Sequence, residues 1–254
     1  MAVRSTTAQE SRVQLNGHQV SLEAIPRHVA VIMDGNGRWA QRKHLPRLAG
    51  HRAGTENIRR VVKALSKYGV KVATLYAFST ENWSRPKEEV RGLMEIMGKV
   101  IHRESLEFHK QGVRLQHLGR LERLPQQLRE AVMKAIELTQ KNEVFTLCVA
   151  FDYGGRDEII GAIQRLIADG VPAEAVTADL LSGYLYTGNI PDPDLIIRTA
   201  GEMRLSNFLL WQSAYSEYYS TPTLWPDFNE REVEKALLEY QRRQRRFGGL
   251  TPVR

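Results

Sequence analysis

Three short segments of the sequence combine charged side chains with glycine, hydroxyl or amide groups in a way that suits the binding of phosphate. The first is DGNGRW at 34–39. Its two glycines let a ligand approach the backbone closely, and successive N–H groups can bind an anion. Arg38 adds a cation for phosphate oxygens, and Asp34 suits Mg²⁺, which prefers carboxylate and phosphate oxygens. The same letters are equally typical of a tight turn, and they match neither the usual ATP-binding nor the usual dinucleotide-binding glycine pattern.

Between the first and second segments, basic residues also gather at the start of the next predicted helix. They are Arg47, His51 and Arg52. The amino end of a helix attracts anions, and Arg47 strengthens that attraction. His51 suits either proton transfer or phosphate binding. Taken alone, a histidine at this place is more often a surface or capping residue.

The second segment is FSTENWSRP at 78–86, a dense polar set directly after an apolar run. Asn82 can donate and accept hydrogen bonds, and Arg85 can reach a phosphate. The alternative is local, because Ser84 also suits the cap of the helix that Pro86 opens.

The third segment runs from Arg198 to Ser206, where two arginines six residues apart flank a glycine-containing turn. Two guanidinium groups and the hydroxyl of Ser206 would clamp a diphosphate, since arginine meets phosphate oxygens with two donors. The alternative is a basic loop on a basic protein. Further along, Glu217 is a candidate second carboxylate, for a metal or for a contact between subunits.

The elements that must position these segments alternate between apolar strands and amphipathic helices. This alternation predicts one α/β domain with an open, mostly parallel sheet and helices on both faces, in which ligands bind beyond the carboxyl ends of the strands. Residues 1–25 are polar and aperiodic and are expected to form a flexible lead-in to a domain at 26–254. The predicted strands are 28–33, 70–79, 113–118, 145–151, 194–199 and 218–224, and the predicted helices are 52–68, 86–106, 125–140, 156–168, 207–215 and 229–246.

Composition narrows the class of protein. The 254 residues carry a net charge of +7, which favours an anionic partner. The single cysteine, Cys148, cannot form an internal disulfide and fits a reducing cytoplasm. The basic run at 241–246 has no interleaved aromatic residues, so it indicates a solvated face or contact with a membrane surface rather than nucleic acid. No nucleophile–base pair stands out, which favours catalysis by positioning and electrostatics.

Five blocks of sequence resemble one known family. HVAVIMDGNGRWA at 28–40, RLAGHRAG at 47–54, YAFSTENWSRP at 76–86, FDYGGRDEI at 151–159 and the stretch 196–228 are similar to the cis-prenyltransferases, the undecaprenyl diphosphate synthase family. The resemblance implies a single domain with a central, mostly parallel six-stranded sheet. It also implies a homodimer and Mg²⁺ as cofactor.

The activity that this resemblance implies is condensation of isopentenyl diphosphate with geranyl or farnesyl diphosphate, giving a Z-configured polyprenyl diphosphate. The product would be undecaprenyl diphosphate or another medium- or long-chain precursor of a carrier lipid. The alternative on the same scaffold is a short-chain or irregular-coupling enzyme of specialised terpenoid metabolism. A non-catalytic subunit is a further alternative, but such subunits typically lack the aspartate and asparagine that stand here as Asp34 and Asn82.

The resemblance also assigns roles to individual residues. Asp34 and Asn82 are implied to be catalytic, and Asp34 and Glu217 to bind the metal. Substrate contacts are implied for Gly35, Asn36, Gly37, Arg38, Trp39, Arg47, His51, Ser79, Thr80, Glu81, Trp83, Arg85, Arg198, Arg204, Leu205 and Ser206.

The chain departs from the family pattern in two places. Ala200 stands where the family usually has glycine, and Phe151-Asp152 stand where an alanine- or asparagine-containing segment is usual. The small Ala77 favours medium or long products. Helix 86–106 and strands 70–78 and 145–151 are expected to wall an apolar tunnel for the growing chain.

Overall fold

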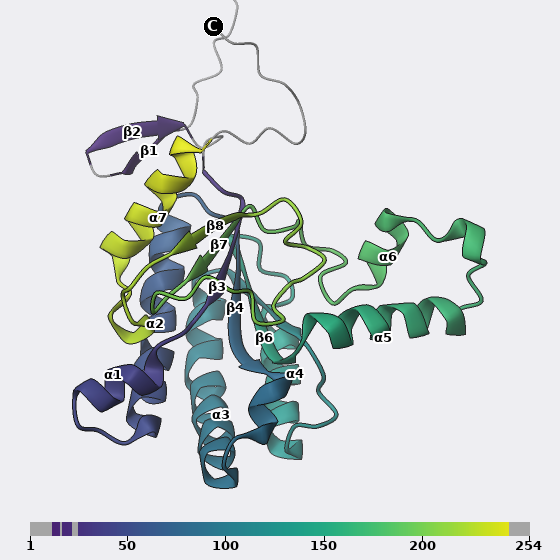
Figure 1. Cartoon of the computed structure of the whole chain (residues 1–254), viewed down its shortest axis with the longest axis horizontal. Coiled ribbons are helices and arrows are strands. Elements are labelled where there is room, and N and C mark those ends of the chain that lie inside the picture. Colours follow the sequence, from purple (N-terminus) through teal and green to yellow (C-terminus); the bar gives the residue numbers. More distant parts are fainter. Residues whose placement is uncertain (1–11, 16, 22–24, 244–254) are drawn as a thin grey trace, which may run out of the picture.

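The computed structural model of the chain describes residues 12–15, 17–21 and 25–243 (Figure 1). Its centre is one six-stranded sheet in which every neighbouring pair of strands is parallel, in the order β5-β6-β4-β3-β7-β8. The predicted mostly parallel six-stranded sheet is therefore confirmed. The strands are β3 (His28–Ile32), β4 (Val72–Ser79), β5 (Val113–Leu118), β6 (Phe145–Tyr153), β7 (Leu195–Arg198) and β8 (Glu217–Ser220).

Helices and turns cover both faces of this sheet. On one face, α2 and α7 pack on β3, β4 and β7, and α3 and α4 extend the same layer over β5 and β6. The segment that follows β7 covers the other face, and α5 and α6 project from the body as an arm (Figure 1). The helices are α1 (Asn36–Arg42), α2 (Arg47–Lys67), α3 (Lys87–Lys110), α4 (Gln126–Thr139), α5 (Gly155–Ala168), α6 (Ala178–Tyr184) and α7 (Glu230–Arg242), with 3₁₀ turns η2 (Thr80–Ser84), η3 (Ala173–Ala175) and η4 (Trp225–Asp227).

The central strands are apolar on both faces because both faces are covered. All five residues of β3 are buried, including His28, whose ring bonds Thr74 Oγ1 and the carbonyl of Pro191. Burial lowers the pKa of His28 to about 4, so this ring is neutral at pH 7. Such strands appear in the sequence as unbroken apolar runs, which is why they could be predicted.

Several element predictions need correction. The segment at 34–39 suits either a turn or a binding loop, and most of it forms the start of α1. Helix α1 ends at Arg42, and α2 begins after a short loop at Arg47 rather than at residue 52. The predicted helix 207–215 is wrong: this stretch is a series of turns, in which Asn207 and Leu209 have positive φ. Helix α6 was not predicted. The last predicted strand, 218–224, starts one residue earlier and ends at Ser220, and residues 244–246 of the last predicted helix lie outside the described residues.

The predicted lead-in at 1–25 contains regular structure in its described part. Strands β1 (Arg12–Leu15) and β2 (His18–Ser21) form a small antiparallel hairpin separate from the main sheet. Residues 1–11, 16 and 22–24 lie outside the described residues.

The sheet order places a crevice beside its middle strand. The chain leaves β3 towards β4 on one side and leaves β7 towards β8 on the other, although β3 and β7 are neighbours. Connections that diverge in this way open a gap at the carboxyl ends of the two strands. Asp34 follows β3 and Arg198 ends β7, so two of the three polar segments meet there. Over the residues that the structure describes, no helix has both the length and the apolar composition to cross a bilayer.

Candidate active site

A cavity of about 700 Å³ lies at the carboxyl end of β3, and we call it the β3 cavity. It brings together eight of the residues that the sequence singled out. Five come from the first segment, two are Arg47 and His51, and the eighth is Arg85 of the second segment. Sequence reasoning missed its remaining lining residues, which lie on α1, on the loop after α1 and beside Asp34. The lining consists of Met33, Asp34, Gly35, Asn36, Gly37, Arg38, Gln41, His44, Leu45, Arg47, His51 and Arg85.

Glycines allow α1 to reach this position. Gly35 has φ +105, and a Cβ there would lie 2.8 Å from Leu224, so a side chain would be both strained and obstructed. Helix α1 then crosses α2 at Gly50 and Gly54, where a Cβ would lie 2.0 Å and 2.2 Å from the oxygen atoms of Asn36. The amino end of α1 is therefore fixed against α2 and η4.

Asp34 lies between two arginines. Its Oδ2 accepts a hydrogen bond from Arg198 Nη2 at 3.0 Å, and its Oδ1 lies 3.4 Å from Arg38 Nη2. Partial burial alone would raise the pKa of Asp34, but the hydrogen bond and the charge of Arg198, together with the charge of Arg38, outweigh it and lower the pKa below its usual value. The carboxylate is ionised at pH 7 and partly exposed.

The loop after β7 is held by Arg198. Its buried guanidinium donates to Ser206 Oγ at 2.8 Å, to the carbonyl of Arg204 and to Asp34. Ala200 has φ +71, a left-handed conformation that favours glycine, so this departure keeps a glycine-like backbone rather than changing the loop. Its carbonyl accepts a hydrogen bond from Arg38 at 3.0 Å. The second arginine, Arg204, is exposed and pairs with Glu202.

Three cationic or potentially cationic side chains of the β3 cavity converge on one carboxylate that sequence reasoning missed. Glu89 Oε1, on α3, lies 3.2 Å from Arg85, 3.4 Å from Arg47 and 3.7 Å from His51. Burial, more than the neighbouring arginines, lowers the pKa of His51 to about 4, so the ring is neutral at pH 7. The position of Glu89 four residues after Arg85 is the one sequence signal that could have indicated this pair.

The second segment forms the 3₁₀ turn η2. Ser79 and Asn82 cap it reciprocally, since the backbone N–H of Ser79 donates to Asn82 Oδ1 at 3.2 Å. Glu81 accepts a hydrogen bond from Asn207 Nδ2 at 2.8 Å, which ties η2 to the loop after β7. The second segment therefore contacts Asn207, the residue directly after the third segment.

Trp83 is held by Asp152, one of the residues that depart from the family pattern. Its indole Nε1 donates to Asp152 Oδ1 at 2.7 Å, and the guanidinium of Arg123 lies over the indole ring at 4.9 Å. Asp152 is buried and has φ +49, a conformation that aspartate and asparagine adopt more readily than most residues. Phe151 stacks on Phe78 next to it.

Some predicted site residues lie apart from these clusters. Trp39 donates its indole N–H to Asp227, and Thr80 and Leu205 do not line the β3 cavity. Glu217 lies opposite Leu195 in the β7–β8 pair, and Leu195 stands three residues before Arg198 on β7. The Glu217 carboxylate accepts a hydrogen bond from Arg243 at 3.0 Å. The structure thus does not bring Glu217 to Asp34, and its metal role stays a prediction.

Two apolar cavities continue from the β3 cavity into the molecule. A connecting cavity of about 50 Å³ shares Met33, Asn36 and His51 with the β3 cavity. It shares Ile58, Met97 and Phe151 with an inner cavity of about 90 Å³.

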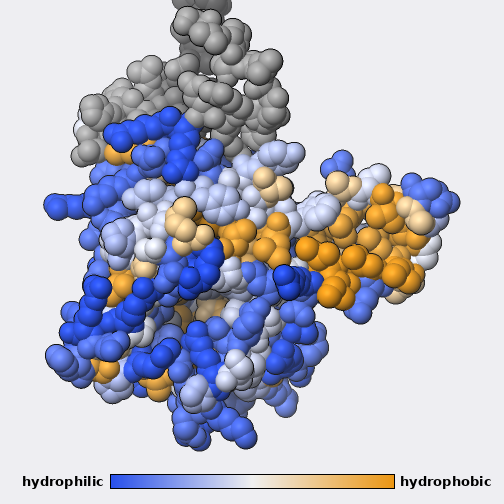
Figure 2. Space-filling view, in the orientation of Figure 1, coloured by the Kyte–Doolittle hydropathy of each residue, from blue (hydrophilic) through white to orange (hydrophobic). Residues whose placement is uncertain are grey.

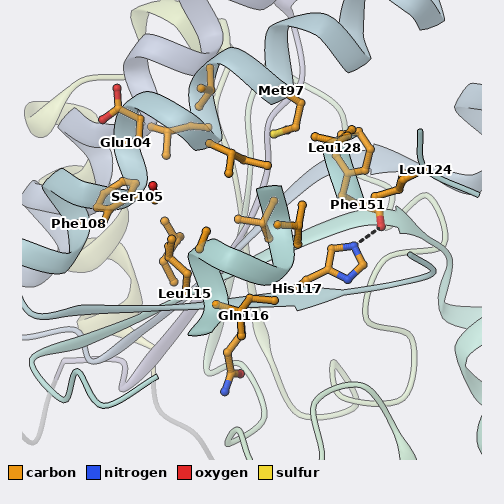
Figure 3. Close-up of a pocket in the computed structure, with 18 residues that line it drawn as sticks. Met97, Glu104, Ser105, Phe108, Leu115, Gln116, His117, Leu124, Leu128 and Phe151 are labelled. Carbon is orange, nitrogen blue, oxygen red and sulfur yellow. Dashed lines mark hydrogen bonds between the residues drawn. The ribbon is translucent and has the colours of Figure 1, made fainter. Parts of the chain in front are cut away.

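The walls of the inner cavity are almost wholly apolar (Figure 3). Of the expected walls, α3 and β6 line this cavity, whereas the expected strand β4 lines only the connecting cavity, through Ala77 and Phe78. Helices α2 and α4 and strand β5 complete the walls of the inner cavity. Among the few polar residues, Gln116 directs its amide away from the others, and His117 bonds the carbonyl of Phe151 at 3.0 Å. Burial lowers the pKa of His117, so it adds no charge at pH 7. A polar, cationic chamber therefore leads into dry space.

Asp34 also fits a magnesium ligand. It is ionised, lines the β3 cavity and is partly exposed. Mg²⁺ is commonly bound by one or two carboxylates together with substrate phosphates and water. No cluster of three or more histidine, cysteine, aspartate or glutamate residues that could hold a metal occurs within 12–15, 17–21 and 25–243, so a cage made of protein side chains alone is absent there.

Comparison with known proteins gives consistent matches over nearly the whole chain. The family model "Putative undecaprenyl diphosphate synthase" matches residues 32–248. An isoprenyl transferase of Heliobacterium mobile is 50% identical over 241 residues, covering 93% of each chain, and one of Clostridium tetani is 50% identical over 236 residues, covering 91% of this chain and 92% of its own.

Solved structures agree with these sequence matches. Lavandulyl diphosphate synthase of Lavandula x intermedia, in complex with dimethylallyl diphosphate, is 36% identical with a TM-score of 0.86, covering 89% of this chain and 99% of its own. A probable undecaprenyl diphosphate synthase of Campylobacter jejuni is 33% identical with a TM-score of 0.76, covering 88% of this chain and 98% of its own.

Proposed function

Since this chain belongs to the undecaprenyl diphosphate synthase family of isoprenyl transferases, we propose that it condenses isopentenyl diphosphate with geranyl or farnesyl diphosphate to give a Z-configured polyprenyl diphosphate. The observation that carries this proposal is that Arg38 and Arg198, from two separate cationic segments, both pair with Asp34, and that apolar cavities adjoin the cavity beside Arg38. Two diphosphates need two cationic sites, and a prenyl chain needs dry space.

The allylic diphosphate would bind in the β3 cavity. Arg38, Arg47 and Arg85 supply cations there, and Gly35 and Gly37 leave the backbone accessible. The apolar tail would then extend past His51 and Asn36 into the connecting cavity, whose lining these two residues share. A neutral His51 suits that boundary, because it places no charge against the tail.

Isopentenyl diphosphate would bind on the other side of Asp34. Arg198, Arg204 and Ser206 lie within one loop, and Arg198 already bonds both Ser206 and Asp34. The loop's link to η2 through Asn207 and Glu81 would place Asn82 and Trp83 beside the reacting carbons.

The reaction would begin when the allylic C–O bond breaks and the electron pair leaves with the diphosphate. The terminal double bond of isopentenyl diphosphate then forms the new C–C bond, and loss of one proton gives the new double bond. The arginines of the β3 cavity stabilise the departing charge, and the apolar walls exclude water from the cation. Asn82 would orient the second substrate for this proton loss.

Magnesium fits this site through Asp34 and the substrate phosphates. When bound, the ion would supply charge neutralisation for the leaving diphosphate. Arg198 and Arg38 keep the Asp34 carboxylate ionised and oriented for that role.

We propose a medium- or long-chain product, as the small Ala77 beside the connecting cavity leaves room for the chain to pass. The alternative is a short-chain or irregular-coupling synthase. The 36% identity to the Lavandula enzyme favours keeping this alternative, although that identity is lower than the 50% to the bacterial isoprenyl transferases.

We further propose that two copies associate through the exposed face of α5. Ile160, Ile163 and Ile167 stand three and four residues apart on one side of this helix and are 55%, 44% and 71% exposed. Figure 2 shows this apolar face on the projecting arm. Sedimentation at micromolar concentration should give a dimer, and Ile163→Glu should give a monomer. The predicted cytoplasmic location and contact with a membrane surface stay proposals.

A product assay tests the proposed function. Purified protein is incubated with Mg²⁺, isopentenyl diphosphate and geranyl or farnesyl diphosphate, and the hydrolysed products are sized by mass. A ladder of Z-polyprenols supports the proposal. Products of three or four units would favour the short-chain alternative, and no product with any primer would contradict the proposal.

A further inference from the structure

The inner cavity is too small for a long product as it stands. Its volume is about 90 Å³, whereas a single water molecule already needs about 10–15 Å³ of such space. Each condensation adds a complete isoprene unit to a chain that must stay dry near the site. A growing tail must therefore separate two of the elements that form the walls. We call each contact between neighbouring wall helices a seam, and the tail separates the helices at the seam that is held most weakly.

A second hollow lies on the outside of the α3–α4 wall. This outer groove has a volume of about 260 Å³ and runs between the two helices. Ile101, Ser105 and Ala135 border both the outer groove and the inner cavity. At these three residues the wall is a single layer of side chains, and two of the three are small.

The two seams beside α3 differ in what holds them. On the α2 side, Arg59 Nη2 lies 2.6 Å from Glu104, and Glu89 pairs with Arg47. On the α4 side, by contrast, no hydrogen bond or ion pair between described residues joins α3 to α4, and the helices meet through apolar side chains. Separating α3 from α4 breaks no polar contact, whereas separating α3 from α2 breaks the Arg59–Glu104 ion pair and leaves the largely buried Glu104 carboxylate with only Arg103 of its own helix.

We propose that the tail of a long product leaves the inner cavity between α3 and α4, passing Ile101, Ser105 and Ala135 into the outer groove. This inference rests on the proposed polyprenyl activity. The groove then contributes to product length, because a tail that enters it keeps apolar contacts with Ile101, Ala131 and Leu138 after the inner cavity is full.

Blocking the groove from outside tests this route. Ala131 lines the outer groove but not the inner cavity, so a bulky group there does not narrow the inner cavity itself. Ala131→Cys is purified and then modified with a bulky maleimide after folding. Native Cys148 is fully buried and burial raises the pKa of its thiol to about 12, so it stays unmodified. The unmodified half of the same preparation is the reference.

The expected result is a shift of the product ladder to shorter chains after modification, with the rate of the first condensation unchanged. Met133→Cys, on the same helix but outside the outer groove, is the matched control and should keep the wild-type ladder when modified. Arg59→Gln, which weakens the α2 seam without changing a residue of the inner cavity, should leave product length unchanged.

Three outcomes would overturn the proposal. One is an unchanged ladder in modified Ala131→Cys, and another is a change of product length in Arg59→Gln alone. The third is a wild-type protein whose longest product has only three or four units, since such a chain would not need the groove. Absence of any condensation in the wild-type protein would instead refute the proposed function, so the two failures are distinct.

Discussion

Replacing Arg198 by glutamine should destabilise the protein as well as weaken substrate binding. Arg198 is the only described residue that bonds Asp34, Ser206 and the carbonyl of Arg204 at once, and its side chain is 9% exposed. Loss of the guanidinium leaves the Asp34 carboxylate without its hydrogen-bonded partner and frees the loop after β7. Arg204→Gln is the matched control, because Arg204 is 62% exposed and pairs with Glu202.

The magnitude follows from burial. Breaking a buried ion pair costs about 3–5 kcal/mol, and the lower end applies because Asp34 is 30% exposed and can be hydrated. For a chain of this size about 1 kcal/mol lowers Tm by roughly 2–4 °C, so Arg198→Gln should lower Tm by roughly 6–12 °C. The exposed pair of Arg204 contributes at most about 1 kcal/mol, so its loss should lower Tm by no more than roughly 4 °C.

Thermal unfolding followed by circular dichroism measures both variants, and steady-state kinetics measures the KM for isopentenyl diphosphate. We expect a higher KM in both variants but a large drop in Tm only in Arg198→Gln. Equal Tm values for the two variants would refute the reasoning, because they would show that the buried contacts of Arg198 add nothing to stability.

The pH dependence gives a second check on the same pair. The pKa of Asp34 in the folded protein lies below its usual value of 3.8, so its interaction with Arg198 stabilises the fold fully above that value. This stabilisation is lost as the pH falls through the pKa of the folded protein. The gap in stability between wild type and Arg198→Gln should therefore be constant near pH 7 and should narrow under acid conditions. A gap that widened on acidification would contradict the assignment.

Three further predictions concern other parts of the site. Glu89→Gln should change the KM for the allylic diphosphate, because Glu89 contacts three side chains of the β3 cavity. The control is Glu88→Gln, on an exposed residue, which should leave this KM unchanged, and equal kinetics in both variants would exclude the role of Glu89. Gly50→Ala should destabilise the protein by about 1–3 kcal/mol in denaturant titration, because the added Cβ would lie 2.0 Å from a backbone oxygen; an unchanged midpoint would contradict the α1–α2 contact. Cys148 should react with a thiol reagent only after unfolding, and rapid labelling of the native protein would show that this strand is not buried.

The parts of the fold that could be predicted are those whose signal is local. Strands such as β3 and β6 are unbroken apolar runs, and α3 begins directly after Pro86 as its sequence indicates. Helix α1 could not be separated from a turn, because DGNG suits both and the outcome depends on Gly50 and Gly54 in another helix. The prediction of a helix at 207–215 failed because Asn207 and Leu209 adopt positive φ, which is incompatible with a right-handed helix.

The candidate site likewise contains contacts that the sequence could predict and contacts that it could not. The parallel sheet brings strand ends to one edge, so residues that follow different strands, such as Asp34 and Arg198, could be predicted to meet. The contact of Glu89 with Arg47 depends on how α3 packs against α2, and the contact of Asp152 with Trp83 depends on a positive φ at the end of β6. Neither has a periodic signal in the sequence.

The position of β3 in the middle of the sheet bears on how the chain is made. β3 is the first strand of the main sheet to leave the ribosome, but its neighbour β7 emerges only after residue 194, and the Asp34–Arg198 contact spans 164 residues. Contacts of such long range form late in folding. Until then one edge of β3 is unpaired, and an unpaired apolar strand is a site for aggregation. The nascent chain therefore carries Asp34 beside an open, apolar strand edge for most of its synthesis, and pairing of β3 with β7 closes that edge only near the end.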